Sequence, residues 1–359
     1  MDESTGLVLG IESSCDETAA AVVRRGEEIL SNVVASQDAR HAPFGGVVPE
    51  IASRAHTEVI TRIVESAIDR AGVEPKELSG IAVTNRPGLL GSLLVGLTAA
   101  KTLAWVWELP LVAVHHLEAH LYAARWSEGL ECPFVGLVAS GGHTSLYWCE
   151  DLLHVRRIGA TTDDAAGEAF DKVAALLGLG YPGGPAIEKA ARGAQDRALR
   201  FPRSRLKGRP WDFTFSGLKT AVLYHVRGVP PAGSPVIDPR EFPAVAAAFQ
   251  EAAVEMLVSA ALDAARELGA RSVTATGGVA ANSRLREELS RGAERLGLRA
   301  ALPARELCTD NAAIVAGRGY HELASGARDP LDTDANALPE RAGYGAAPSG
   351  GELREGRRS

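Results

Sequence analysis

Apolar runs of strand length alternate with helix-length segments in an order that occurs twice along the chain. In the first half we predict strands at residues 7–13, 19–24, 29–35, 81–84 and 111–114, and helices at 49–71, 90–107 and from His116 onward. In the second half we predict strands at 134–140, 144–150, 153–158, 272–276 and 298–302, and helices at 166–177, 243–268, 282–297 and 310–325. Both halves follow the order βββαβαβα, and their βαβ units predict an α/β fold with helices on both faces of each sheet.

The repeat predicts two lobes with a ligand cleft between them. We expect an N-terminal lobe over residues 1–130 and a C-terminal lobe over 131–325, with strand ends and helix N-termini converging on the cleft. A segment rich in Gly, Pro and Arg, from about 179 to 240, predicts a partly irregular insertion in the second lobe. The tail at 326–359 has little apolar periodicity, and we expect most of residues 330–359 to be poorly ordered.

Composition and charge favour a cytoplasmic protein. No stretch approaches the ~20 uninterrupted apolar residues of a membrane span, and the polar, acidic start does not resemble a signal peptide. The four cysteines are scattered, which indicates reduced thiols. A net charge of -7 argues against a protein that coats nucleic acid without specificity.

Two histidines and a distant carboxylate predict a metal site. His116 and His120 are four residues apart, so on a helix they share one face. The repeat places Asp310 at the start of the corresponding helix in the second half. Two histidines and one carboxylate leave coordination positions open for substrate. Two core histidines remain the alternative, whereas a zinc peptidase is disfavoured because Glu118 would lie about 200° around the helix from His116.

Two glycine-rich loops after predicted strands indicate a nucleotide site. Paired glycines at 141–142 would let backbone N–H groups approach a phosphate, although a plain hairpin turn would also use them. The segment 277–282 ends in Asn282, which could cap a helix or bind the ligand. Asp171, Gly184 and Glu188 are candidates for binding a ribose.

Two further features carry charge. Glu12 and Asp16 lie at the end of the first strand and are candidates for proton transfer in the cleft. Six basic residues lie between Arg197 and Arg209, and they fit either a solvated loop or a contact with an RNA backbone.

The ordered motifs resemble the TsaD family (also called Gcp or YgjD), bacterial tRNA threonylcarbamoyladenosine transferases related to the KEOPS catalytic subunit. The resemblance runs from Leu7 to Ala324. It rests on the motifs GIESSCDET at 10–18, FGGVVPE at 44–50, VHHLEAH at 114–120, SGGHT at 140–144, DDAAGEAFDK at 163–172, YPGGP at 181–185, FTFSGLK at 213–219, GGVAAN at 277–282 and CTDN at 308–311.

The resemblance implies the actin-like ATPase (ASKHA) fold and a divalent metal ion bound by His116, His120 and Asp310. Fe²⁺ is the first choice for this ion, and zinc and magnesium are the alternatives. It also implies ligand contacts at Val138, Ala139, Ser140, Gly141, Gly142, Asp171, Gly184, Glu188 and Asn282. The implied reaction moves threonylcarbamoyl from threonylcarbamoyl-AMP to N6 of adenosine 37 in tRNAs that read ANN codons and releases AMP. ATP or ADP is expected to fit the same cleft.

The implied partners are tRNA, a TsaB-like paralogue, a TsaE-like ATPase and a TsaC-type synthase that supplies the donor, with no membrane involved. One departure is Arg86, where the family usually has glycine; a positive φ there would strain the loop. Two other functions remain open on the same fold. They are a sugar-kinase-like phosphotransferase, which has no use for two histidines, and a non-enzymatic, nucleotide-dependent assembly module, which would leave the metal site idle.

Overall fold

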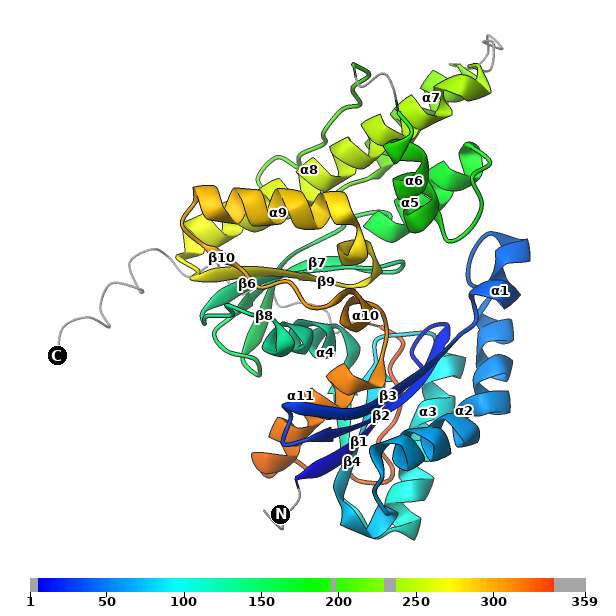
Figure 1. Ribbon diagram of the computed structural model, residues 1–359, viewed down its shortest axis with the longest axis vertical. Helices are drawn as coiled ribbons and strands as arrows, with labels where there is room; N and C mark the ends of the chain where they lie inside the picture. Colours follow the sequence, from blue (N-terminus) through cyan, green and yellow to red (C-terminus); the bar gives the residue numbers. More distant parts are fainter. Residues whose placement is uncertain (1–5, 195–197, 229–236, 339–359) are drawn as a thin grey trace, which may run out of the picture.

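The protein folds into two lobes stacked along its long axis (Figure 1). The computed structural model describes residues 6–194, 198–228 and 237–338. Each lobe is built around one five-stranded mixed sheet.

The two sheets have the same topology. The first has the order β3-β2-β1-β4-β5, from β1 (Leu7–Glu12), β2 (Glu17–Arg24), β3 (Glu28–Ser36), β4 (Leu78–Arg86) and β5 (Leu111–His115). The second has the order β10-β9-β6-β7-β8, from β6 (Phe134–Ala139), β7 (Thr144–Cys149), β8 (Val155–Ala160), β9 (Ser272–Thr276) and β10 (Arg299–Ala300). In both sheets the first strand pairs antiparallel with the second and parallel with the fourth. The predicted duplication is therefore confirmed.

The central strand β1 is buried on both faces, as its uninterrupted apolar run predicts. Leu7, Leu9 and Ile11 point into a core shared with α2 (Pro49–Ala71) and α3 (Leu90–Val106). Val8, on the opposite face, belongs to a core that includes α11 (Ala312–Ala324). Helix α2 has the predicted bounds and is followed by Gly72, whose φ of 66° suits a left-handed helix C-cap.

The last helix of each half packs against the sheet of the other half. Leu117 and Leu121 of α4 (His116–Tyr122) belong to a core with β6 and β7 of the second sheet. Helix α11 lies against β1 and β2, beside the blue strands in Figure 1. Two glycines permit these crossings: a Cβ on Gly10 would lie 2.4 Å from Ala312 O, and one on Gly136 would lie 2.3 Å from a methyl of Leu121.

Five helices of ten or more residues belong to the described part of the C-terminal lobe. They are α5 (Ala166–Leu176), α6 (Gly183–Arg192), α7 (Ser216–Arg227), α8 (Phe242–Leu268) and α9 (Ser283–Arg295). The segment expected to be irregular thus holds α6 and α7. Helix α6 escapes sequence analysis because it is short, begins with Gly-Gly-Pro and buries only a narrow stripe that includes Ile187 and Ala191.

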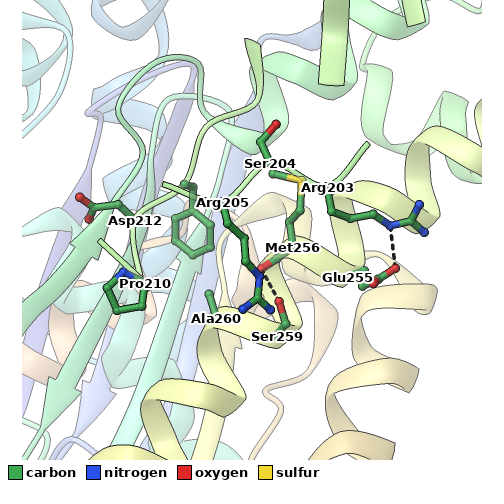
Figure 2. Close-up of a pocket in the computed structure, with 10 residues that line it drawn as sticks. Arg203, Ser204, Arg205, Pro210, Asp212, Glu255, Met256, Ser259 and Ala260 are labelled. Carbon is green, nitrogen blue, oxygen red and sulfur yellow. Dashed lines mark hydrogen bonds and ion pairs between the residues drawn. The ribbon is translucent and has the colours of Figure 1, made fainter. Parts of the chain in front are cut away.

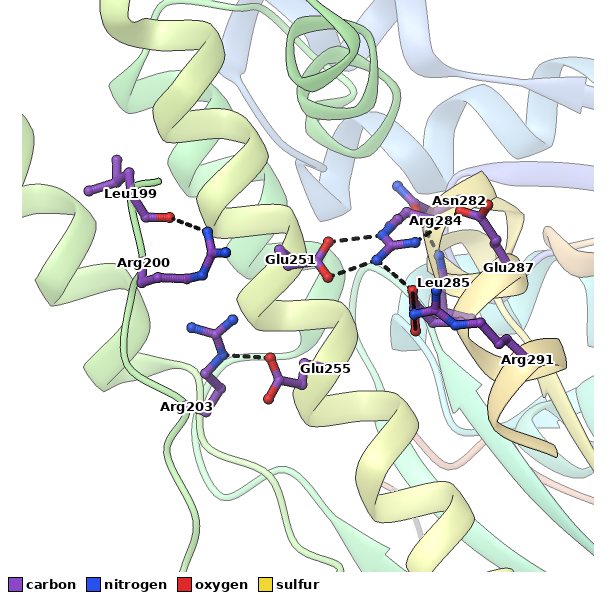
Figure 3. A network of polar contacts seen from close by, with 11 residues as sticks. Leu199, Arg200, Arg203, Glu251, Glu255, Asn282, Arg284, Leu285, Glu287 and Arg291 are labelled. Carbon is purple, nitrogen blue, oxygen red and sulfur yellow. Dashed lines mark hydrogen bonds and ion pairs between the residues drawn. The ribbon is translucent and has the colours of Figure 1, made fainter. Parts of the chain in front are cut away.

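Helix α8 forms the centre of this lobe. Together with the preceding turn it spans Pro239–Leu268 and has the length and apolar composition of a membrane span, yet most of it is buried within the lobe. Arg284 of α9 bonds both carboxylate oxygens of Glu251 on α8 at 2.9 and 2.8 Å (Figure 3). This bidentate pair fixes α9 across α8.

The described part of the tail follows the N-terminal sheet. Ala113 N donates to Asp329 Oδ2 at 2.8 Å, and Asn336 N donates to Asn85 O at 2.9 Å. Part of the tail for which the sequence predicts poor order is thus tied to the N-terminal sheet. Asn85 in β4 bonds Asp334 and Asn336, partners that apolar periodicity does not reveal. The rest of the predicted disordered tail, 339–359, lies outside the described residues.

Candidate metal centre and ligand cleft

The exchanged helices bring His116, His120 and Asp310 together. His116 is the first residue of α4, and Asp310 lies between α10 (Arg305–Cys308) and α11. His120 Nε2 is 3.0 Å and His116 Nε2 is 3.6 Å from Asp310 Oδ1. The two imidazole rings lie 4.6 Å apart, centroid to centroid. Asn311 stabilises this arrangement by accepting from Ile314 N at 3.3 Å, which caps α11.

This donor set fits a divalent metal ion. One ligand atom from each of the three residues lies within 4.8 Å of the other two. The 3.6 Å separation of His116 Nε2 from Asp310 is too long for a hydrogen bond, so this nitrogen is available to an ion. His116 Nδ1 lies 3.0 Å from Glu12 Oε2, which is the carboxylate–histidine arrangement found behind metal-bound imidazoles.

The site is strongly polarised. Burial opposes a charged imidazole, yet Asp310 and Glu12 raise the pKa of His116 to about 9. Burial would raise the pKa of Asp310, but His116 and His120 hold it below its usual value. The buried Glu12 and the half-buried Asp310 therefore surround the two imidazoles with negative charge, which favours a cation here.

A second group of carboxylates borders the cleft. Asp16, Glu17 and Asp38 each place an oxygen within 4.8 Å of the others, and α1 (Asp38–His41) starts beside them. Burial raises the pKa of Asp16, and the charges of Asp310 and Asp38 raise it further. The charge of Asp16 also raises the pKa of Asp171 in the other lobe, where burial is the main cause. The two predicted residues are thus close enough for their charges to interact.

The glycine loop after β6 leaves open space. A Cβ on Gly141 or Gly142 would meet nothing within 4 Å among the described residues. The loop is anchored by Ser140, whose N donates to His143 O at 2.8 Å and whose O accepts from Gly167 N at 3.1 Å. The side chains of Val138 and Ala139 point into the two cores of the lobe, so only their backbone can face a ligand.

His143 is a cleft residue that sequence analysis did not single out. Burial lowers its pKa to about 4, with a further contribution from His116. Its position in the motif at 140–144 is the signal that could have found it.

The four remaining candidate ligand residues differ in their surroundings. Asp171 Oδ1 accepts from Gly183 N at 2.7 Å, and a Cβ on Gly184 would meet open space. Glu188 is engaged within the lobe by Ser283 Oγ and Arg192, both at 2.6 Å. Asn282 is engaged likewise, because it caps α9 at Leu285 N and donates to Gln250 Oε1 at 2.9 Å. The side chains of Glu188 and Asn282 therefore hold α9 in place. For Asn282 this is the helix-capping role that the sequence offered beside ligand binding.

The basic segment after α6 lies against α8 (Figure 2). Arg203 Nε bonds Glu255 at 2.8 Å, and Arg205 lies 3.7 Å from Asp263. Arg209 pairs with Asp212 at 3.5 Å, whereas Arg197 lies outside the described residues. Carboxylates thus offset much of the positive charge that the sequence shows.

Arg86 causes no backbone strain. It is the last residue of β4, and its register partner in the neighbouring strand β5 is His115. Among the described residues other than glycine, only Arg25 and Glu108 have a positive φ. The loop after β4 therefore accepts arginine where a glycine was expected.

Comparisons with known proteins show which family the chain belongs to. A family model described as "TsaD: tRNA N6-adenosine threonylcarbamoyltransferase" matches residues 28–317. A tRNA N6-adenosine threonylcarbamoyltransferase from Symbiobacterium thermophilum is 50% identical over 337 residues, covering 94% of this chain and 96% of the relative. One from Anaeromyxobacter dehalogenans is 51% identical over 336 residues, covering 92% and 98%.

Solved structures with low identity share the fold. HypF of T. kodakarensis matches with a TM-score of 0.59 at 16% identity, over 89% of this chain and 48% of that one. Component A of the Acidaminococcus fermentans (R)-2-hydroxyglutaryl-CoA dehydratase matches with a TM-score of 0.53 at 14% identity, over 89% and 99%. The expected actin-like ATPase fold is confirmed.

Proposed function

Because the chain belongs to the TsaD family, and so transfers threonylcarbamoyl to N6 of a tRNA adenosine, we propose that this reaction takes place in the cleft between its two lobes. Family membership decides against the sugar-kinase-like and non-enzymatic alternatives. The observation that carries the proposal is the convergence of His116, His120 and Asp310, which come from both halves of the chain.

The donor in this proposal is threonylcarbamoyl-AMP, bound with its adenylate on the C-terminal lobe. The open backbone at Gly141 and Gly142 suits a phosphate, because nothing within 4 Å occupies the space where a Cβ would stand. Asp171 and Gly184 lie on the same lobe and suit the ribose, whereas Glu188 and Asn282 support them by holding α9. ATP or ADP would fit the same positions.

The acyl end of the donor points to the metal centre. His116, His120 and Asp310 would hold the ion. Two histidines with one carboxylate suit Fe²⁺ or zinc better than magnesium, and the family resemblance puts Fe²⁺ first. When bound, the ion supplies Lewis-acid polarisation of the donor carbonyl.

Asp16 is the proposed proton acceptor. N6 of adenosine 37, in a tRNA that reads ANN codons, attacks the carbamoyl carbon. The new C–N bond replaces the C–O bond to the phosphate, Asp16 takes the N6 proton, and AMP leaves. An elevated pKa suits this role, because a base works best when its pKa lies near the working pH. An anticodon-loop base can be splayed out without opening a duplex.

A TsaB-like paralogue is the proposed partner for helix α3. Leu90, Leu94, Trp105 and Val106 are exposed on this helix, whose only charged residue is Lys101. Such a face is costly to leave in water and suits a protein interface. A TsaE-like ATPase and a TsaC-type synthase complete the proposed cytoplasmic system.

The decisive experiment supplies synthetic threonylcarbamoyl-AMP and tRNA to the purified protein, with and without those partners, and analyses the nucleosides by mass spectrometry. We expect His116→Ala to abolish product while the protein stays folded. His154→Ala is the matched control, since His154 is exposed and bonds only Asp151 and its turn among the described residues. Near-normal transfer by metal-free His116→Ala protein would refute the proposed site.

A further inference from the structure

Glu12 is a fully buried carboxylate at the end of β1 with both oxygens engaged. Oε1 accepts from Ser14 N at 2.6 Å. Oε2 accepts from Thr84 Oγ1 at 2.6 Å and lies 3.0 Å from His116 Nδ1. Groups from the first turn, from β4 and from α4 thus fix one carboxylate in a single orientation.

This arrangement determines which nitrogen of His116 faces the cleft. An ion at Nε2 requires the neutral imidazole, which carries one N–H, and the carboxylate beside Nδ1 would hold that proton there. The lone pair of Nε2 is then directed toward Asp310, where an ion would be bound. His120 has no such support, because its buried Nδ1 has no hydrogen-bond partner among the described residues.

A direct role of Glu12 in moving a substrate proton conflicts with its surroundings. A proton acceptor needs an oxygen that the substrate can reach. Glu12 is 0% exposed, and its oxygens already accept from Ser14 and Thr84. Asp16, four residues further on, is 8% exposed and lies beside Glu17 and the exposed Asp38.

We infer that Glu12 is a positioning residue that orients His116 toward the metal ion and does not touch the substrate. The inference rests on the proposed metal centre and names a residue behind it. Thr84 supports Glu12 in the same way that Glu12 supports His116, because the Thr84 hydroxyl donates to Glu12 Oε2 and orients it. Loss of such support typically weakens metal binding about 10- to 100-fold.

The test measures Co²⁺ binding by its visible absorption in the full-length protein and compares three variants. In Glu12→Gln one end of the side chain becomes a donor, so either Ser14 N or His116 Nδ1 loses its carboxylate acceptor. In the second case His116 Nδ1 keeps only the neutral hydroxyl of Ser14, 3.2 Å away. We expect a Co²⁺ Kd about 10- to 100-fold higher, a changed absorption spectrum, and an unchanged Kd for ADP. Thr84→Val should raise the Co²⁺ Kd less. Asp171→Asn is the crossed control and should weaken ADP binding but not Co²⁺ binding.

An unchanged Co²⁺ Kd and spectrum in Glu12→Gln, together with lost transfer, would overturn the inference and place Glu12 on the substrate. If Glu12→Gln does not fold, Thr84→Val decides, and wild-type Co²⁺ binding in that variant would also overturn it. Failure of the proposed function gives a different result: wild-type protein would then form product after its ion is removed.

Discussion

Replacing Gly10 with alanine tests how closely the two halves are joined at the site. Gly10 lies in the middle of β1, where α11 crosses from the other half of the chain. An added Cβ would lie 2.4 Å from Ala312 O, 2.7 Å from Ala316 N and 2.8 Å from Ala316 Cβ. These are backbone atoms and a methyl carbon fixed to the backbone, so no side-chain rotation relieves the overlap.

The size of the effect follows from these distances. A contact of 2.4 Å is about 1 Å short of the ~3.5 Å van der Waals optimum. Helix α11 must therefore move by roughly this amount, at a cost of about 1–3 kcal/mol for overpacking. Asp310 directly precedes α11 and would move with it. Metal sites tolerate errors of only about 0.2 Å in ligand distance, so the metal affinity should fall more sharply than the stability.

The assay combines thermal unfolding with Co²⁺ titration. We expect Gly10→Ala to lower the unfolding temperature by several degrees and to weaken Co²⁺ binding at least tenfold. Gly136→Ala should do less, because it meets the end of the flexible Leu121 side chain. Gly46→Ala, where a Cβ meets open space, should do neither. Wild-type stability and Co²⁺ affinity in Gly10→Ala would refute the claim that this glycine positions the helix.

Three further predictions concern other parts of the chain. Arg318→Met removes the buried cation that pairs with Glu118 of α4 and Glu322 of α11. The free energy of unfolding, measured by chemical denaturation, should fall by about 3–5 kcal/mol. A loss below about 1 kcal/mol would contradict this. If the basic segment contacts tRNA, Arg205→Glu and Lys207→Glu should each reduce the salt dependence of tRNA binding by about one ion; unchanged slopes would make it a solvated loop. Burial alone would raise the pKa of Asp163, but hydrogen bonds from residues 214–216 lower it. The ionised carboxylate therefore stabilises the fold above about pH 4, and this stabilisation is lost as the pH falls further. Asp163→Asn should lower the unfolding temperature at pH 7 but not near pH 2.

The three residues of the candidate metal centre were predictable from sequence because helix geometry and the internal repeat both constrain them. His116 and His120 share a face through their spacing alone, and the repeat supplied Asp310 as the third member. Spacing does not reveal which candidate side chains already have partners. Asn282 and Glu188 have motif positions that suit a ligand, yet their polar atoms bond Gln250 and Ser283. Such partners are distant in sequence, so only the fold identifies them.

The sequence by itself determined the two repeated units, because strand and helix periods are local properties of the chain. It also determined the kinds of ligand atom at the site. Only the tertiary structure decided that α4 and α11 exchange lobes, with Gly10 and Gly136 giving them room. Only it placed Glu12 behind His116. Both facts depend on contacts between residues far apart in the chain, and these are set by how two buried sheets share the helices packed between them.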